Sequence, residues 1–211
     1  MIEELKFDFE ERTISTIDNK NQESSSLNKM HITDIGLPRV IEKKLLGCVN
    51  YQKTTGGLPT NLLLIGCPTK FVSQILESVA HETSSNLKLI EDVNLKQGDL
   101  AKILTNISVG DFVCLKNLEA LGSEIIHTVK QVMSSFILDI IIGKGPAARN
   151  ISIPLPKFST IITVENISQI PSDMLELFYD IIDQVIAYYE ENGADEKQKE
   201  NLDKIRDAIS N

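Results

Sequence analysis

The 211-residue chain contains no tryptophan, and aromatic residues make up only 5% of it. Positive charge is also limited, because 21 lysines and arginines face 30 aspartates and glutamates, which gives a formal net charge of −9 at pH 7. A protein that holds nucleic acid by charge needs an excess of basic residues to neutralise phosphates. We therefore do not expect this chain to bind DNA directly on its own.

Cysteine and histidine are scarce as well, with three of each. Cys48, Cys67 and Cys114 are far apart and odd in number, which favours a reduced, cytoplasmic protein. The histidines show no metal-ligand spacing, so no metal site is expected. The longest apolar run, FILDIIIG at 136–143, is short and interrupted by Asp139, so it cannot span a bilayer.

Apolar runs alternate with segments of helical period along most of the chain. Four runs read as buried strands, at 62–65, 87–90, 111–115 and 159–164. Helices are expected after Pro38 and over 71–81, 99–106, 123–133 and 174–189. Asp99 and Ser123 are the expected N-caps of the third and fourth of these helices. Strands that alternate with helices predict a parallel sheet with helices on both faces.

The segment Leu138 to Leu155, LDIIIGKGPAARNISIPL, interrupts this alternation. Two runs of alternating apolar residues flank a turn rich in Gly, Pro and Ala, which predicts a β-hairpin with a long tip. We expect its distal isoleucines, near Ile142 and Ile151, to remain exposed. The chain as a whole divides into a tail and linker at 1–30, a core at 31–170 and a helical segment at 171–211.

Two runs carry a family resemblance: GDLAKILTNISVGDFV at 98–113 and LDIIIGKGPAARNISIPLPKF at 138–158. They closely resemble RuvB, the Holliday-junction branch-migration motor of the AAA+ class, and the resemblance extends from about Asp34 to Val164. It implies a three-layer α/β core of the P-loop NTPase type, with a projecting β-hairpin and C-terminal helices. For GDLAKILTN we favour a structural role, in which Leu100, Ile103 and Leu104 pack a helix on the sheet.

The family's phosphate loop, G-P-P-G-x-G-K-T, falls on residues 66–73. Gly66, Pro68 and Ser73 match it, whereas Thr69 and Phe71 replace two glycines and Val72 replaces the lysine. Glycines let the backbone N–H groups wrap the phosphates, and the lysine adds charge. Under this resemblance the loop is degenerate, with Phe71 expected to fill the phosphate cradle. Cys67, in the same loop, is read as a plain thiol rather than a nucleophile.

The family's second motif, D-E-x-H, falls on residues 116–119. Lys116 replaces the aspartate that supports magnesium, and its charge is expected to repel the ion. Asn117 replaces the glutamate that activates water. The sensor residues fall near Glu165 and Asn166, and the segment of the arginine finger, SDMLELF, contains no arginine. These substitutions predict a pseudo-ATPase that is not an enzyme and that has no cofactor.

The best-preserved element is the hairpin, which in the family contacts the partner protein RuvA. The matching positions are Ile140, Ile142, Lys144, Arg149, Ile151 and Ile153. One interpretation is that they bind a partner. In the other, the isoleucines pack on the domain and the two charges at the tip are solvated.

The resemblance therefore predicts a non-catalytic RuvB-like module that binds a protein in DNA recombination or repair. The partner is a RuvA-like or RuvB-like subunit, or a second copy of the chain. One alternative is a nucleotide-responsive subunit of a branch-migration complex, and another is a self-assembling structural protein. Only 47 residues follow the last predicted strand, where the family continues with a lid and a winged helix, so a motor acting alone on DNA is not expected.

Overall fold

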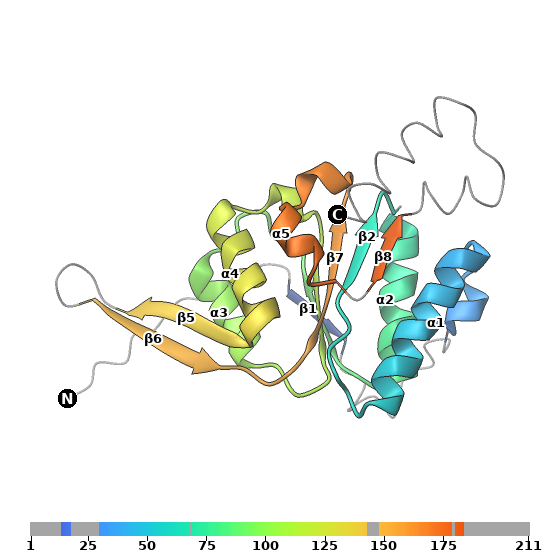
Figure 1. The fold of residues 1–211 in the computed structure, drawn as a ribbon, viewed down its shortest axis with the longest axis horizontal. Coiled ribbons are helices and arrows are strands. Elements are labelled where there is room, and N and C mark those ends of the chain that lie inside the picture. Colours follow the sequence, from blue (N-terminus) through green and yellow to red (C-terminus); the bar gives the residue numbers. More distant parts are fainter. Residues whose placement is uncertain (1–13, 18–29, 68, 143–147, 179, 184–211) are drawn as a thin grey trace.

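The computed structural model describes residues 14–17, 30–67, 69–142, 148–178 and 180–183 (Figure 1). The main sheet consists of the strands β1 (Ile14–Ile17), β2 (Leu62–Ile65), β3 (Leu87–Ile90), β4 (Phe112–Leu115), β7 (Ser159–Val164) and β8 (Asp180–Asp183). The longer helices are α1 (Arg39–Thr54), α2 (Thr69–Thr83), α3 (Gln97–Thr105) and α4 (Ser123–Ser135). The short helical turns are η1 (Ile32–Asp34), η2 (Leu118–Ala120), η4 (Ile167–Gln169) and α5 (Ser172–Leu175).

The strand order of the main sheet is β1-β3-β4-β7-β2-β8. All neighbours pair in parallel except β1, which pairs antiparallel with β3. In the β2–β7 pair, Leu62 lies opposite Ile161 and Ile65 opposite Val164. The parallel sheet predicted from the alternating elements is confirmed.

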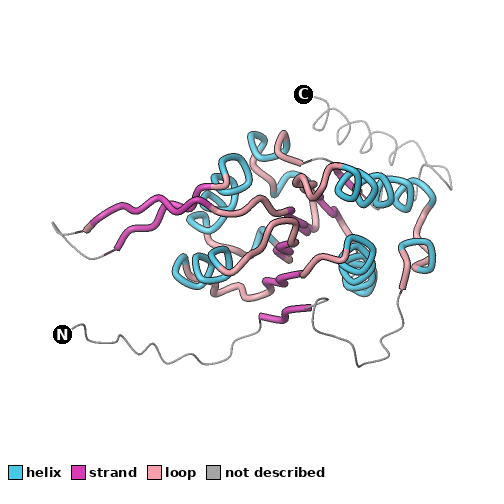
Figure 2. The backbone as a smooth tube through the Cα atoms, turned by 90° about the horizontal axis from the view of Figure 1, so that it is seen from below, coloured by secondary structure: helices cyan, strands magenta, loops and turns pink. Residues whose placement is uncertain are grey.

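Helices cover both faces of the sheet, which creates two hydrophobic cores (Figures 1 and 2). Alternate residues of one strand enter different cores: Leu63 and Ile65 of β2 face α3 and α4, and Leu62 and Leu64 face α1 and α2. Strands buried on both faces need continuous apolar runs, as the sequence of β2 has. This confirms the three-layer α/β class.

The helix boundaries correct two predicted caps. Helix α3 begins at Gln97 after Lys96, so Asp99 lies inside its first turn. Helix α4 begins at Ser123 after Gly122, so Ser123 is the first helical residue. Both side chains still lie in a first turn, where an acidic group such as Asp99 interacts favourably with the helix dipole.

The strands β5 (Ile137–Ile142) and β6 (Arg149–Pro154) form the predicted hairpin, which projects from the body on the left of Figure 1. They pair antiparallel, with Leu138 opposite Ile153 and Ile140 opposite Ile151. Leu138 is buried in the core between the sheet and α4, Ile140 and Ile153 are half-buried against that core, and Ile141 and Ile151 are exposed. The half of the hairpin near its root therefore packs on the core, and Ile141 and Ile151 remain accessible.

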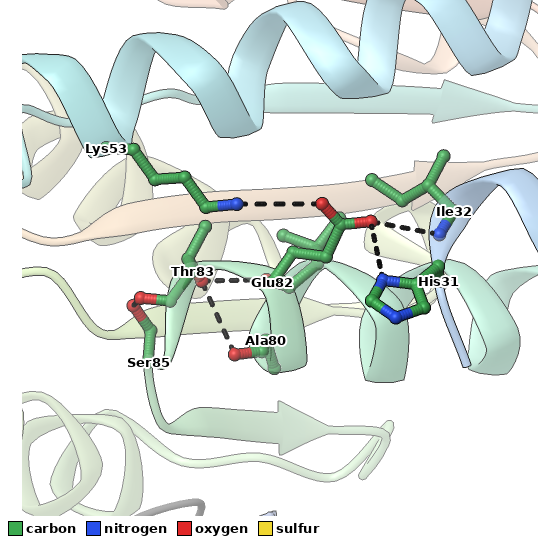
Figure 3. A network of polar contacts seen from close by, with 8 residues as sticks. His31, Ile32, Lys53, Ala80, Glu82, Thr83 and Ser85 are labelled. Atoms are coloured by element: carbon green, nitrogen blue, oxygen red, sulfur yellow. Dashed lines mark hydrogen bonds and ion pairs between the residues drawn. The ribbon is translucent and has the colours of Figure 1, made fainter. Parts of the chain in front are cut away.

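A polar network attaches the first described residues of the body to α1 and α2 (Figure 3). Glu82 Oε1 accepts the backbone N–H of Ile32 at 3.1 Å and lies 3.8 Å from His31 Nδ1. Its other oxygen, Oε2, lies 3.6 Å from Lys53 Nζ. Because Glu82 is on α2 and Lys53 on α1, one carboxylate joins three elements.

Two strands differ from the sequence prediction. The segment predicted as a helix over 174–189 contains only the short α5 and then the strand β8, which pairs with β2. That prediction is wrong over 180–183, because the open edge of β2 offers a backbone ladder that local helical period cannot reveal. Strand β1 was not predicted at all. Residues 184–189 of that predicted helix lie outside the described residues. Among the described residues, no helix has the length and apolarity needed to span a membrane.

Candidate functional site

The loops that follow the parallel strands meet at the carboxyl edge of the sheet. The N–H of Gly66, after β2, donates to the carbonyl of Val164 at 2.9 Å. The N–H of Lys116, after β4, donates to the carbonyl of Ile90 at 3.0 Å. These hydrogen bonds place the predicted phosphate loop and the predicted metal and base motif along the same edge, with β7 between their strands. Ligands of open α/β sheets bind at this edge.

Gly66 turns the chain from β2 toward α2. Its φ is +60°, a conformation that glycine adopts without the strain that a Cβ would cause. Helix α2 begins three residues later, at Thr69. The first four N–H groups of a helix have no partner within the helix, so α2 presents backbone donors and the positive end of its dipole at this edge.

The side chains of the predicted loop divide between core and surface. Val72 is 3% exposed and belongs to the core under α1 and α2, and Phe71 is half-buried against the same core. The contact of Phe71 with the core accounts for its buried part, and its filling of the phosphate cradle stays a prediction. Thr69 is exposed, Ser73 is half-buried, and Pro68 lies outside the described residues.

Matching the family loop residue by residue does not identify a positive charge that lies at this edge. Lys70, in the first turn of α2, is exposed. It stands at the variable position of the family loop, so a residue-by-residue match assigns it no role. Two positions before Val72, it supplies an exposed ammonium group in the turn whose backbone N–H groups have no acceptor within the helix.

The structure changes the interpretation of Lys116. Its ammonium group forms an ion pair with the carboxylate of Glu91, at the end of β3. The charge is compensated by this neighbour, which contradicts the expectation that Lys116 simply repels a metal ion. Asn117, the next residue, is exposed and adopts the left-handed conformation with φ 52°. Its backbone N–H donates to Thr163 Oγ1 of β7 at 2.9 Å.

Glu119 is the carboxylate that joins this motif to the predicted sensor loop. Its Oε1 accepts the N–H of Glu165, after β7, at 3.2 Å. Its Oε2 is buried and has no hydrogen-bond partner among the described residues. Asn166 is occupied in capping the turn η4, because its side chain accepts the N–H of Ser168. The sequence comparison placed Glu119 at the histidine of the family motif and so gave it no weight.

Cys67 lies in the same loop and is half-buried. Burial raises the pKa of its thiol to about 11. A thiol is a nucleophile only as the thiolate, so at neutral pH this cysteine is almost entirely in its unreactive form. The described residues contain no group of three or more His, Cys, Asp or Glu side chains that could hold a metal ion.

The hairpin residues form a second group, which the structure does not bring near the first. Helix α4 runs from the carboxyl edge to the root of the hairpin, and its 13 residues span about 20 Å. Ile141 is 76% exposed and Ile151 is 42% exposed. Ile140 and Ile153 are half-buried against the core, and Arg149 is exposed. The side chains of Ile142 and Lys144 lie outside what the structure describes.

Asp139 connects the hairpin to α4. Its two carboxylate oxygens accept hydrogen bonds from Ser152 on β6 and from Gln131 on α4. The bond from Ser152 and then that from Gln131 lower the pKa of this carboxyl group. The residue that interrupts the apolar run of the sequence thus holds the hairpin at a defined angle to the helix.

Comparison with known proteins places this geometry in a family. The Holliday junction DNA helicase RuvB P-loop domain matches residues 33–183. The Holliday junction branch migration complex subunit RuvB of Wolinella succinogenes is 32% identical over 139 residues, which cover 65% of this chain and 42% of that protein. The subunit of the same name from Fusobacterium nucleatum is 30% identical over 186 residues, covering 86% of this chain and 55% of that protein.

Solved structures support the same fold. The RuvB Holliday junction branch migration motor of Thermotoga maritima superimposes with a TM-score of 0.61 at 19% identity, over 76% of this chain and 50% of that one. At this identity the likeness concerns the fold alone. The chain spans about half the length of these relatives.

These findings correct one prediction. The substitutions in the two motifs led us to expect that the chain is not an enzyme, but the matching family is that of a DNA helicase, which is a class of enzyme. A single motif position is a poor guide to activity when a neighbouring group changes its electrostatics, as Glu91 does beside Lys116. The match covers well over half of the chain, and this protein therefore belongs to the RuvB P-loop domain family.

Proposed function

We propose that the chain is a nucleotide-responsive subunit of a Holliday-junction branch-migration complex. The observation that carries the proposal is the family match over residues 33–183, which includes the strand–turn–helix at 62–83 and the projecting hairpin. The two candidate sites lie at opposite ends of α4. In this proposal, one binds the nucleotide phosphates and the other binds a second protein of the complex.

The carboxyl edge suits a phosphate group. The free N–H groups at the start of α2 and the helix dipole favour an anion there. The exposed ammonium group of Lys70 adds a charge in the same turn. Val72 is buried and contributes only packing. The phosphates are therefore held mainly by backbone donors and Lys70, and the nucleotide supplies the phosphate chemistry when bound.

The hairpin suits an apolar partner surface. Ile141 and Ile151 are exposed at the distal part of an element that is anchored at its root by Leu138. The two side chains lie on opposite faces of the hairpin, because Ile151 pairs with Ile140 and Ile141 pairs with Asn150. A partner that covers either face therefore removes a large apolar side chain from water. A RuvA-like subunit is the partner that the family resemblance implies.

A thermal-shift experiment with Mg–ATP and Mg–ADP tests the nucleotide site. A ligand at 100 times its Kd stabilises the folded state by about 2.7 kcal/mol, which corresponds to roughly 5–10 °C in Tm for a chain of this size. Lys70→Ala should reduce the shift. The matched control, Lys157→Ala, replaces an exposed lysine after the hairpin and should leave it unchanged. No shift with either nucleotide would refute the proposal, and an equal shift in both variants would refute the role of Lys70.

A further inference from the structure

Glu119 has hydrogen-bonding capacity that the fold itself leaves unused. A carboxylate offers two oxygens that can accept several hydrogen bonds. Among the described residues this one accepts a single bond, to Oε1 from the N–H of Glu165 at 3.2 Å, and its buried Oε2 accepts none. Buried polar atoms nearly always have a partner, and an exception calls for an explanation such as a catalytic role or a bound water.

A single peptide group joins this carboxylate to the predicted phosphate loop. The carbonyl of Val164 accepts the N–H of Gly66 at 2.9 Å. The N–H of Glu165 belongs to the same peptide group and donates to Glu119 Oε1 at 3.2 Å. Given the bond lengths within a peptide group, the Gly66 nitrogen and Glu119 Oε1 lie no more than about 9 Å apart. A ligand held by the loop therefore lies close to the carboxylate.

Local structure directs Glu119 to this edge of the sheet. Strand β4 ends in the turn η2, which begins after Asn117 in the left-handed conformation. Leu118 is fully buried and holds the turn on the core that contains α3 and α4. Glu119, the next residue, is half-buried. Its side chain therefore lies at the surface of the edge, beside the end of β7, and not in the core.

Charge limits what the unused oxygen can accept. A nucleotide phosphate is anionic, so it repels a carboxylate and has no proton to donate to it. A water molecule between the two groups suits both, because it donates a hydrogen bond to the carboxylate and turns a lone pair toward the phosphorus atom. The ammonium group of Lys116 is paired with Glu91, so it does not take the place of this water.

We propose that Glu119 is the proton acceptor for hydrolysis of a nucleoside triphosphate at this edge, which rests on the nucleotide site proposed above. The water oxygen forms a bond to the terminal phosphorus while the bond from that phosphorus to the bridging oxygen breaks. One proton of the water passes to the Glu119 carboxylate. The nucleoside diphosphate leaves with the electron pair of the broken bond, and the terminal group leaves as inorganic phosphate.

Glu119→Gln in the full chain tests this role, because the amide oxygen can still accept the N–H of Glu165 but the side chain cannot take up a proton. We expect kcat for phosphate release from Mg–ATP to fall by at least about 100-fold, as for loss of a general base, with KM unchanged. Mg–ATP should still raise the Tm of the variant as much as that of the unaltered chain. The matched control, Glu124→Gln, replaces an exposed carboxylate in the first turn of α4 and should change none of these values.

The outcomes separate this role from the nucleotide site itself. An unchanged kcat in Glu119→Gln would overturn the role of Glu119, and so would an unaltered chain that binds Mg–ATP without releasing phosphate. Neither result would affect the nucleotide site. A Tm shift that is lost in Glu119→Gln would make Glu119 a binding group and would also overturn its role as proton acceptor. Absence of any Tm shift in the unaltered chain would refute the nucleotide site and this role together.

Glu119→Asp provides a second measurement, should Glu119→Gln fail to fold by circular dichroism. The aspartate keeps the charge but shortens the side chain by one bond, and a displacement of about 1 Å can lower a rate by about 100-fold. We therefore expect a similar loss of kcat with the Tm shift retained. A kcat equal to that of the unaltered chain would overturn the proposal.

Discussion

The exposed isoleucines of the hairpin allow the binding of a partner to be separated from the stability of the fold. Ile141 is 76% exposed, so replacing it by Asp removes little buried surface. A surface substitution of this kind changes the free energy of unfolding by no more than about 0.5 kcal/mol. Leu138, at the root of the same strand, is 1% exposed. Leu138→Ala removes buried methyl groups and should cost about 2–5 kcal/mol.

Ile141→Asp should weaken partner binding more than Leu138→Ala, although it costs less stability. Burying one isoleucine side chain in an apolar groove contributes about 1.5–3 kcal/mol. Its loss in Ile141→Asp should weaken binding by about 10- to 150-fold, since 1.4 kcal/mol corresponds to a factor of ten. Ile151→Asp reports on the other face of the hairpin, because Ile151 pairs with Ile140 whereas Ile141 pairs with Asn150. The variant with the larger loss identifies the face that the partner covers.

The assay is isothermal titration of the full chain with a purified RuvA-like subunit, beside urea unfolding followed by circular dichroism. Val109→Asp is the matched control, because Val109 is 66% exposed but lies between α3 and β4, outside the hairpin. It should change neither binding nor stability. The reasoning is refuted if Ile141→Asp and Ile151→Asp both bind as tightly as the unaltered chain. It is also refuted if either of them lowers the free energy of unfolding as much as Leu138→Ala.

Three further predictions concern single side chains. Asp139→Ala should make the hairpin more susceptible to limited proteolysis. Hydrogen bonds lower the pKa of Asp139, so the protection that its carboxylate gives the hairpin is complete at neutral pH. This protection is lost as the pH falls below the ordinary pKa of 3.8. Susceptibility equal to that of the unaltered chain at pH 7 would contradict this. Glu82→Ala leaves the buried Ile32 N–H without its acceptor and should lower the free energy of unfolding in urea by about 1–3 kcal/mol. Lys53→Ala removes a lysine whose side chain is 46% exposed and should cost at most about 1 kcal/mol. Equal losses in the two variants would show that the hydrogen bond from Ile32 N–H is unimportant. With a thiol pKa of about 11, Cys67 should react with iodoacetamide at pH 7 about 100-fold more slowly than an ordinary cysteine with a pKa of 9, and rapid labelling would show that it is not buried.

Local pattern was sufficient where burial is uniform along an element. The run at 62–65 is apolar at every position because β2 is covered on both faces, and the alternation from Leu138 to Leu155 predicts a hairpin because one face of its root enters the core. Motif spacing located the two motifs at 66–73 and 116–119, and the strand order then brought them to one edge of the sheet, since the carboxyl ends of parallel strands lie together.

Motif spacing did not show how the side chains at that edge interact. The ion pair of Lys116 with Glu91 joins residues 25 positions apart, and the bond from Glu165 to Glu119 joins residues 46 apart. Both contacts depend on which strands are neighbours, a property of the order β3-β4-β7 and not of any local segment. The assumption that Lys116 acts as a free charge therefore failed.

The sequence by itself determined the alternation of strands and helices, the hairpin and the RuvB-like arrangement of motifs, because each depends on residues close together in the chain or on a fixed spacing. The tertiary structure alone decided that Ile14–Ile17 and Asp180–Asp183 become strands at the two edges of the sheet. Neither segment has a strong strand pattern of its own. Each gains its structure from the unpaired backbone groups of a neighbouring strand, β3 or β2, that is distant in the sequence.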